Sequence, residues 1–186
     1  MAKKRGMSRR DFFRSGMLGG VGIGLGGFTA ASLAMLWPSL RGGFGAKINL
    51  GRAADLKAEL AAIPNNWKYY AEARSYVILY NPSPGQESFY KGVAAGGFLA
   101  TYQKCAHLGC RVPPCETSGW LECPCHGSRY NKAGEYEFGP APRGLDHFPI
   151  VIDGDNVIVD TADKHEGPPR GTNTINQNPA GPHCQG

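Results

Sequence analysis

Two short cysteine- and histidine-containing motifs constrain this chain of 186 residues more than any other feature of its sequence. They are C-A-H-L-G-C at 105–110 and C-P-C-H-G-S at 123–128, and together they hold four of the six cysteines and two of the five histidines. Thiolate sulfur and imidazole nitrogen are both ligands of transition metals. A C-x-H turn opposite a C-x-x-H turn can place one cysteine and one histidine from each of two loops around a pair of metal ions. The sequence therefore predicts a metal centre held between two loops.

The residues by themselves leave three uses open. A mixed-ligand iron–sulfur cluster accounts for both residue types, and imidazoles in place of two thiolates raise its reduction potential. A zinc site normally shows C-x₂₋₄-C and H-x₃₋₅-H spacings, which differ from the spacing here. A pure disulfide framework leaves His107 and His126 without a role. The mixed-ligand cluster is therefore the favoured interpretation.

Two further segments, Ser128-Arg129-Tyr130 and Gly139-Pro140-Ala141-Pro142, extend the pattern. With the paired motifs they make the chain resemble the Rieske iron–sulfur proteins, and in particular the subunit of quinol-oxidising cytochrome bc and bf complexes. The resemblance covers roughly residues 8–160. It implies an all-β fold, with a Rieske-type antiparallel β-sandwich head and cluster-binding loops on a single N-terminal transmembrane helix. It also implies one 2Fe–2S cluster as the cofactor.

The resemblance further implies a role for each site residue. The ligands would be one cysteine and one histidine from each loop: Cys105, His107, Cys123 and His126. The two cysteines would bind one iron and the two histidines, which are also the expected catalytic residues, would bind the other. A disulfide between Cys110 and Cys125 would join the loops. Ser128 and Tyr130 would donate hydrogen bonds to cluster or ligand sulfur and raise the potential, and the proline loop at 139–142 would cover the third side.

The chain departs from the family pattern at three positions. Ala106 stands where the family commonly has threonine, so one side-chain hydrogen bond near the first loop is missing. Cys115 and Cys184 have no counterpart in the usual motif. Cysteines that share an oxidising compartment tend to pair, but the wide separation of these two leaves a second disulfide open.

The N-terminal region carries the basic charge and an apolar segment. Residues 1–14 hold six basic side chains and one aspartate, and the other 172 residues hold 14 of each sign, so the net charge of +5 belongs to this tail. A nucleic-acid-binding domain needs a basic stripe on its folded surface, which is absent. Residues 15–37 are mostly apolar and long enough to cross a bilayer. The basic residues before them predict a cytoplasmic N-terminus.

The segment Ser8–Arg14 resembles a twin-arginine export signal. A small-residue cleavage site is expected after the apolar run, but the nearest match, Thr29-Ala30-Ala31, lies inside it. The sequence therefore favours a retained anchor in a bacterial inner membrane or thylakoid, with the head on the periplasmic or lumenal side.

Composition and local patterns give the remaining organisation. The 27 glycines and 14 prolines indicate turns rather than long helices. Residues 53–62 predict a helix, and strands are expected at 68–73, 76–80, 98–102 and 120–122, with a hairpin over 148–160. The predicted domains are a cytoplasmic tail 1–14, an anchor 15–38, a glycine-rich hinge 39–47, a Rieske domain 48–160, and an extended tail 161–186 with little packing of its own.

The function expected from this resemblance is electron transfer in a membrane quinol–cytochrome c, or plastocyanin-like, oxidoreductase. The expected partners are a cytochrome b-type subunit, a cytochrome c or plastocyanin-like acceptor, and quinol, within a dimeric multisubunit complex. The main alternative is the Rieske small subunit of a periplasmic molybdenum oxidase such as arsenite oxidase. A Rieske-type oxygenase or its ferredoxin fits less well, because those proteins lack the anchor and the disulfide cysteines.

Overall fold

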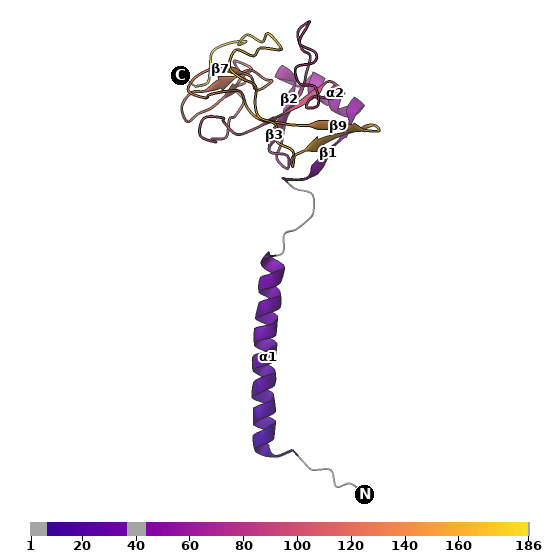
Figure 1. The fold of residues 1–186 in the computed structure, drawn as a ribbon, viewed down its shortest axis with the longest axis vertical. Helices are drawn as coiled ribbons and strands as arrows, with labels where there is room; N and C mark the ends of the chain where they lie inside the picture. The colour runs from indigo at the N-terminus through magenta and orange to yellow at the C-terminus, as the bar shows by residue number, and fades with distance from the viewer. Residues whose placement is uncertain (1–6, 37–43, 186) are drawn as a thin grey trace. The chain divides into compact units, whose positions relative to one another are not determined.

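The computed structural model describes residues 7–36 and 44–185, and the chain divides into two units, 1–41 and 42–186 (Figure 1). The first unit contains a single helix within its described residues, and the second contains the β-rich head.

Helix α1 spans Arg9–Leu36 and begins six residues before the predicted anchor. Ser8 explains the earlier start, because its Oγ accepts a hydrogen bond from the backbone N–H of Asp11 at 3.2 Å and donates one to the Asp11 carboxylate at 2.6 Å. Such reciprocal capping satisfies donors that a helix N-terminus leaves free. The helix has 28 residues and is long and apolar enough to cross a membrane. The last two residues of the predicted anchor, 37 and 38, lie outside the described residues.

The described part of the head is built from antiparallel strands in three sheets. The first sheet has the order β1-β10-β9, the second β2-β3-β4-β8 and the third β5-β6-β7. The strands are β1 Lys47–Arg52, β2 Trp67–Tyr70, β3 Ser75–Leu79, β4 Phe98–Tyr102, β5 Leu121–Glu122, β6 Arg129–Tyr130, β7 Tyr136–Phe138, β8 His147–Phe148, β9 Ile150–Asp153 and β10 Asn156–Asp160.

The first two sheets share one apolar core, as expected for a β-sandwich. Helix α2, Ala53–Ala62, adds Leu56 and Leu60 to this core, and the strands contribute residues such as Val77, Phe98 and Val157. A second cluster of buried residues lies around Tyr130 and the candidate ligand cysteines. The all-β prediction for the head is therefore confirmed, and the candidate site has an apolar core of its own.

Several predicted elements match the structure and others differ for local reasons. Helix α2 and strand β4 have the predicted bounds, and β9 and β10 form the predicted hairpin. Strand β2 ends at Tyr70 rather than Ala73, because the next residues turn and Arg74 adopts a positive φ of 49°. Phe148 belongs to β8, which pairs with β4, and Pro149 separates it from β9.

The predicted hinge at 39–47 falls mostly on residues 37–43, outside the described residues. Its described end is packed on the head. The backbone N–H groups of Gly45 and Ala46 donate to the Thr161 hydroxyl at 2.8 and 3.0 Å, and the Phe44 ring stacks on Tyr102. Lys47 already belongs to β1, a strand that the sequence did not predict.

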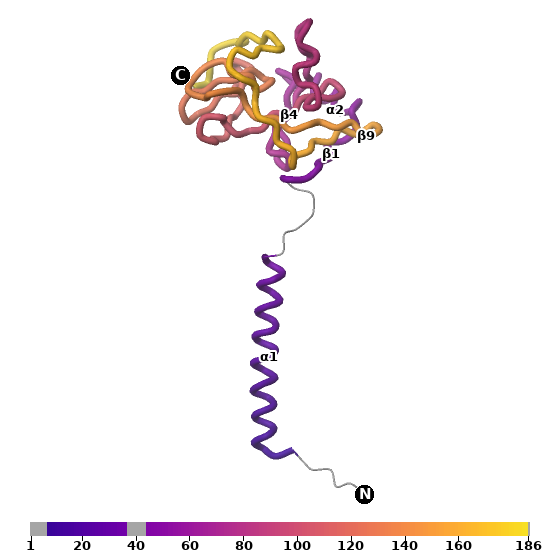
Figure 2. The backbone as a smooth tube through the Cα atoms, viewed as in Figure 1, coloured from indigo at the N-terminus to yellow at the C-terminus, as the bar shows by residue number. Residues whose placement is uncertain are grey.

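The expectation that residues 161–186 pack little was wrong. The segment, coloured yellow in Figure 2, lacks named strands in its described part, but it packs on the third sheet. The N–H of Cys184 donates to Glu122 in β5, and Arg129 in β6 donates to the Gln185 carbonyl. Thr174 is fully buried and donates to the buried carboxylate of Glu135 from both its N–H and its hydroxyl. Cys184 forms a disulfide with Cys115. The segment is therefore a structural part of the head.

Candidate metal centre

The first motif forms a loop closed by its own backbone. The N–H of Cys105 donates to the Cys110 carbonyl at 2.8 Å, and the N–H of Gly109 donates to the Cys105 carbonyl at 2.9 Å. Gly109 has a φ of 77°, which glycine adopts at no steric cost. The loop buries Cys105, leaves His107 half-buried and exposes Leu108.

The second motif repeats this architecture. The N–H of Cys123 donates to the Ser128 carbonyl at 2.8 Å, and the N–H of Gly127 donates to the Cys123 carbonyl at 3.1 Å. Gly127 has a φ of 72°. Here too the first cysteine is buried, while His126 is exposed. Two turns of the same design thus present the candidate ligands.

The loops bring the two cysteines together and the two histidines together. Cys105 and Cys123 are the free cysteines, and each is less than a twentieth exposed. Burial raises the pKa of the Cys123 thiol, and the neighbouring Cys105 raises it further. The ring centroids of His107 and His126 lie 4.8 Å apart. The thiols stand here for the thiolates that a metal would bind.

The donor set fits a mixed-ligand 2Fe–2S cluster. Among the described residues, no hydrogen-bond partner reaches the buried Nδ1 of His107. An unsatisfied buried polar atom costs about 1–3 kcal/mol, and coordination to a metal would remove that cost. Two free buried thiols and an unpartnered imidazole nitrogen are the ligand types that this cluster requires.

A disulfide joins the two loops, as predicted. Cys110 and Cys125 are bonded, with their Cα atoms 6.6 Å apart. Each follows a candidate ligand within its own motif, so the bond restrains the separation of the two loops. The Cys110–Cys125 prediction is confirmed.

Tyr130 and Ser128 lie beside the buried cysteines but have different partners. The Tyr130 hydroxyl is 3.1 Å from the Cys105 Sγ, and the side chain is fully buried. Burial raises the pKa of Tyr130, as does Cys105, so the phenol keeps its proton and can donate to a ligand sulfur. The Ser128 Oγ accepts a hydrogen bond from the N–H of Ala141 at 3.1 Å. Its donation to sulfur stays a prediction.

The proline loop at 139–142 packs closely on the second motif. Gly139 has a φ of 99°, and a Cβ there would lie 2.6 Å from the Cα of Ser128, so the contact requires glycine. The hydroxyl of Tyr136 donates to the Gly139 carbonyl at 2.6 Å. The Nε of Arg170 donates to the Ala141 carbonyl at 2.9 Å. Sequence reasoning did not single out Arg170, because it stands in the segment that was expected to pack little.

A buried carboxylate next to a candidate ligand was also missed. Glu122 precedes Cys123 and is 1% exposed. Burial acts to raise the pKa of Glu122, but hydrogen bonds from Ser118, from the N–H of Gln185 and from His183 outweigh it and hold the pKa below its usual value. In the sequence, this site was indicated by one feature alone, the position of His183 next to Cys184, a cysteine that has no counterpart in the family motif.

The comparisons with known proteins agree with this geometry. The Rieske [2Fe-2S] domain family matches residues 67–149. The iron–sulfur subunit of the cytochrome b6-f complex of Synechococcus sp. (strain JA-3-3Ab) is 31% identical over 159 residues, covering 81% of this chain and 86% of that protein. The chain therefore belongs to the Rieske iron–sulfur proteins, whose cofactor is a 2Fe–2S cluster and whose role is electron transfer.

Two further proteins are similar to this chain. The ubiquinol-cytochrome c reductase iron–sulfur subunit of Rhodobacter capsulatus is 48% identical over 74 residues, covering 38% of this chain and 37% of that protein. A chain of a hyperthermophilic respiratory Complex III is 26% identical, with a TM-score of 0.44, covering 78% of this chain and 97% of that one. The relatives by sequence are thus iron–sulfur subunits of oxidoreductase complexes.

Proposed function

We propose that this chain is the electron-transfer subunit of a membrane quinol–cytochrome c, or plastocyanin-like, oxidoreductase. The observation that carries the proposal is the pairing of two closed loops, which bury both free cysteines and bring His107 and His126 within 4.8 Å of each other. The names of the relatives, from cytochrome b6-f and ubiquinol-cytochrome c reductase complexes, support it. The expected partner within the complex is a cytochrome b-type subunit.

The proposed ligands are Cys105 and Cys123 on one iron and His107 and His126 on the other. When bound, a 2Fe–2S cluster with two imidazole ligands supplies one-electron chemistry at a higher potential than an all-cysteine cluster. The buried Nδ1 of His107 is the atom of that ring that we assign to the metal. The exposed ring of His126 then offers its other nitrogen to the solvent side of the loop.

The chain's own residues bind the substrate and move its proton. The outer nitrogen of His126 accepts a hydrogen bond from a quinol hydroxyl and holds the proton when the electron leaves. Tyr130 donates to the Cys105 sulfur and so stabilises the more negative state of that sulfur. The Cys110–Cys125 disulfide joins the two motifs, and the proline loop packs on the second of them, so both restrain the positions of the ligands.

The topology that we propose places α1 in the membrane and the head on the periplasmic or lumenal side. The length and apolar composition of α1 support the anchor. The arginines Arg9 and Arg10, at its first turn, are the proposed export signal, and basic residues on this side favour a cytoplasmic N-terminus.

Purification of the native complex from membranes tests the function. We expect this chain to co-purify with b-type haem and with quinol-dependent reduction of a c-type cytochrome or a plastocyanin-like acceptor. A complex that contains molybdenum and lacks b-type haem would contradict the proposal and support the molybdenum-oxidase alternative.

A further inference from the structure

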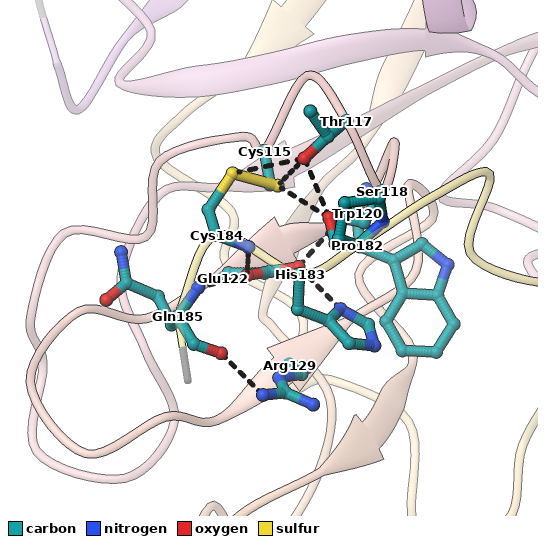
Figure 3. The surroundings of a disulfide bond; sticks show 10 residues. All are labelled: Cys115, Thr117, Ser118, Trp120, Glu122, Arg129, Pro182, His183, Cys184 and Gln185. Carbon is teal, nitrogen blue, oxygen red and sulfur yellow. Dashed lines mark hydrogen bonds and ion pairs between the residues drawn. A yellow bond between two sulfur atoms is a disulfide. The ribbon is translucent and has the colours of Figure 1, made fainter.

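The carboxylate of Glu122 is buried one residue before the candidate ligand Cys123. Its partners within the described residues are four hydrogen-bond donors (Figure 3). The Ser118 hydroxyl and the His183 Nδ1 each lie 2.7 Å from Oε1, and the N–H groups of Cys184 and Gln185 donate to Oε2 at 2.8 and 2.9 Å. A buried carboxylate is stable only when such donors replace the water that it has lost.

Three of these four donors come from the irregular segment 182–185. This segment is held in place by several contacts, one of which is a hydrogen bond from Arg129 to the Gln185 carbonyl. Cys184 is bonded to Cys115, the Thr117 hydroxyl donates to the Pro182 carbonyl at 2.7 Å, and the His183 ring lies 5.2 Å from the ring of Trp120 (Figure 3). The disulfide bridges 69 positions of sequence, so it brings to Glu122 donors that no local pattern would place there.

The strand that carries Glu122 leads directly into the second loop. The N–H of Glu122 donates to the Pro113 carbonyl at 2.9 Å, and the N–H of Cys115 donates to the Trp120 carbonyl at 2.7 Å. The two ends of the 113–122 turn are therefore joined to each other, and segment 182–185 contacts the carboxylate of Glu122 at one of these ends. A displacement of segment 182–185 would move Glu122, to which it is hydrogen-bonded, and Glu122 is joined to Cys123 by a single peptide bond.

We propose that residues 182–185, fastened by the Cys115–Cys184 disulfide, are a positioning element for Cys123. The inference rests on the proposed role of Cys123 as a ligand. The segment holds β5 in place and compensates the negative charge of Glu122. Without it, fewer donors would offset the charge of the Glu122 carboxylate, and the negative potential of that carboxylate beside a centre that gains an electron would disfavour reduction.

The test compares reduction potentials in the full-length protein. In the variant Cys115→Ser/Cys184→Ser, the ratio of reduced to oxidised protein at a fixed ambient potential should fall about tenfold, which is about 59 mV for a one-electron couple. His183→Ala keeps the disulfide and removes one donor, so a smaller shift in the same direction is expected. His165→Ala is the matched control, because His165 contacts Asp163 rather than Glu122.

A second substitution distinguishes two causes of a changed potential: the loss of donors to the Glu122 carboxylate and a general loss of packing. When Glu122→Gln is added to the variant Cys115→Ser/Cys184→Ser, the carboxylate charge is removed, and we expect the reduction potential to return toward the wild-type value. An unchanged potential in both Cys115→Ser/Cys184→Ser and His183→Ala would overturn the proposal, as would an equal shift in His165→Ala. Absence of a Rieske-type EPR signal from the wild-type protein would instead overturn the proposed function.

Discussion

At the scale of single residues, the candidate ligands differ in burial, with the cysteines on the buried side of the site and a histidine on its exposed side. The cysteines are buried beside Tyr130, whereas His126 is exposed. This division follows from the chemistry proposed for each side, because thiolates are protected from oxidation by burial, while an imidazole that receives a proton must be reached by substrate.

The ligand assignment predicts the outcome of single substitutions. Cys105→Ser or His126→Ala should abolish the EPR signal of a reduced cluster with mixed nitrogen and sulfur ligands. His165→Ala should leave the signal unchanged, since the partner of that ring is Asp163. Native protein that contains stoichiometric zinc and no iron would refute the assignment.

The hydrogen bond from Tyr130 predicts a change in potential without loss of the cluster. Tyr130→Phe removes a donor 3.1 Å from the Cys105 sulfur. We expect a loss of about 1 kcal/mol of preference for the reduced state, or roughly 40 mV, measured by redox titration. Tyr80→Phe is the matched control, because that buried hydroxyl contacts Thr174 instead. A shift of equal size in the control would show that the potential does not depend on the contact with sulfur.

His147 predicts how the stability of the head depends on pH. The ring is fully buried, its Nε2 donates to the Ala133 carbonyl at 2.7 Å, and burial lowers the pKa of His147 to about 4. The unfolded chain binds this proton below about pH 6.5, so the stabilisation is complete above that pH and is lost as the pH falls toward 4. The loss amounts to about 3 kcal/mol by pH 4.

Thermal unfolding followed by circular dichroism at pH 7.5 and pH 5 measures this contribution. The decrease in Tm between the two pH values should be smaller in His147→Gln than in the wild type, whatever the absolute Tm of the variant. His165→Gln should behave like the wild type in this comparison. An identical decrease in all three proteins would exclude His147 as the source.

At the scale of structural elements, the two loops act as one unit because a covalent bond joins them. The Cys110–Cys125 disulfide joins residues 15 positions apart. By restricting the unfolded chain, a loop of this length stabilises the folded state by about 3 kcal/mol. The loop cysteines pack in an apolar cluster with Tyr130, and this bond and the backbone hydrogen bonds of each loop further restrain the spacing of the loops.

Removal of that disulfide should therefore affect the cluster more than the fold. In Cys110→Ser/Cys125→Ser we expect a lower reduction potential and a shorter cluster lifetime in air, with the β-sheet signal in circular dichroism retained. Leu108→Ala, an exposed change on the same loop, keeps the disulfide and should leave both quantities unchanged. An unchanged potential and lifetime in the double variant would contradict the role of the disulfide.

At the scale of the whole molecule, the proposed function requires the head to reach both an electron donor and an electron acceptor. Residues 37–43, which contain Gly42 and Gly43, connect the two units and lie outside the described residues. The fixed contacts of Phe44 and Gly45 with the head mark the far boundary of any hinge. The hinge itself stays a prediction from the glycine content.

Replacement of Gly42-Gly43 by Pro-Pro tests the hinge. Proline fixes φ and removes the N–H donor, which stiffens the segment. We expect a normal EPR signal and normal assembly but a large loss of quinol-dependent turnover. An Ala-Ala replacement restricts the backbone far less and should retain most of the turnover. Turnover close to wild type in the Pro-Pro variant would leave the glycines only the role of ending the membrane helix.

The candidate ligands and the elements with strong local signals could be predicted from the amino-acid sequence alone. The spacing of the two motifs identified the cysteine and histidine pairs, and local propensity gave α2, β4 and the β9–β10 hairpin their positions. These features depend on residues that are near neighbours in the chain. A pattern read along the sequence can therefore reveal them.

The role of the C-terminal segment, in contrast, depends on contacts that form only in the folded head. Its polar and glycine-rich composition predicted little packing, yet it donates to Glu122, to Glu135 and to the carbonyl of Ala141 in the proline loop. The physical reason is that an irregular segment has no periodic pattern that encodes its partners. Its hydrogen bonds and its disulfide to Cys115 join residues far apart in sequence, and such partners become defined only when the folded chain brings them together.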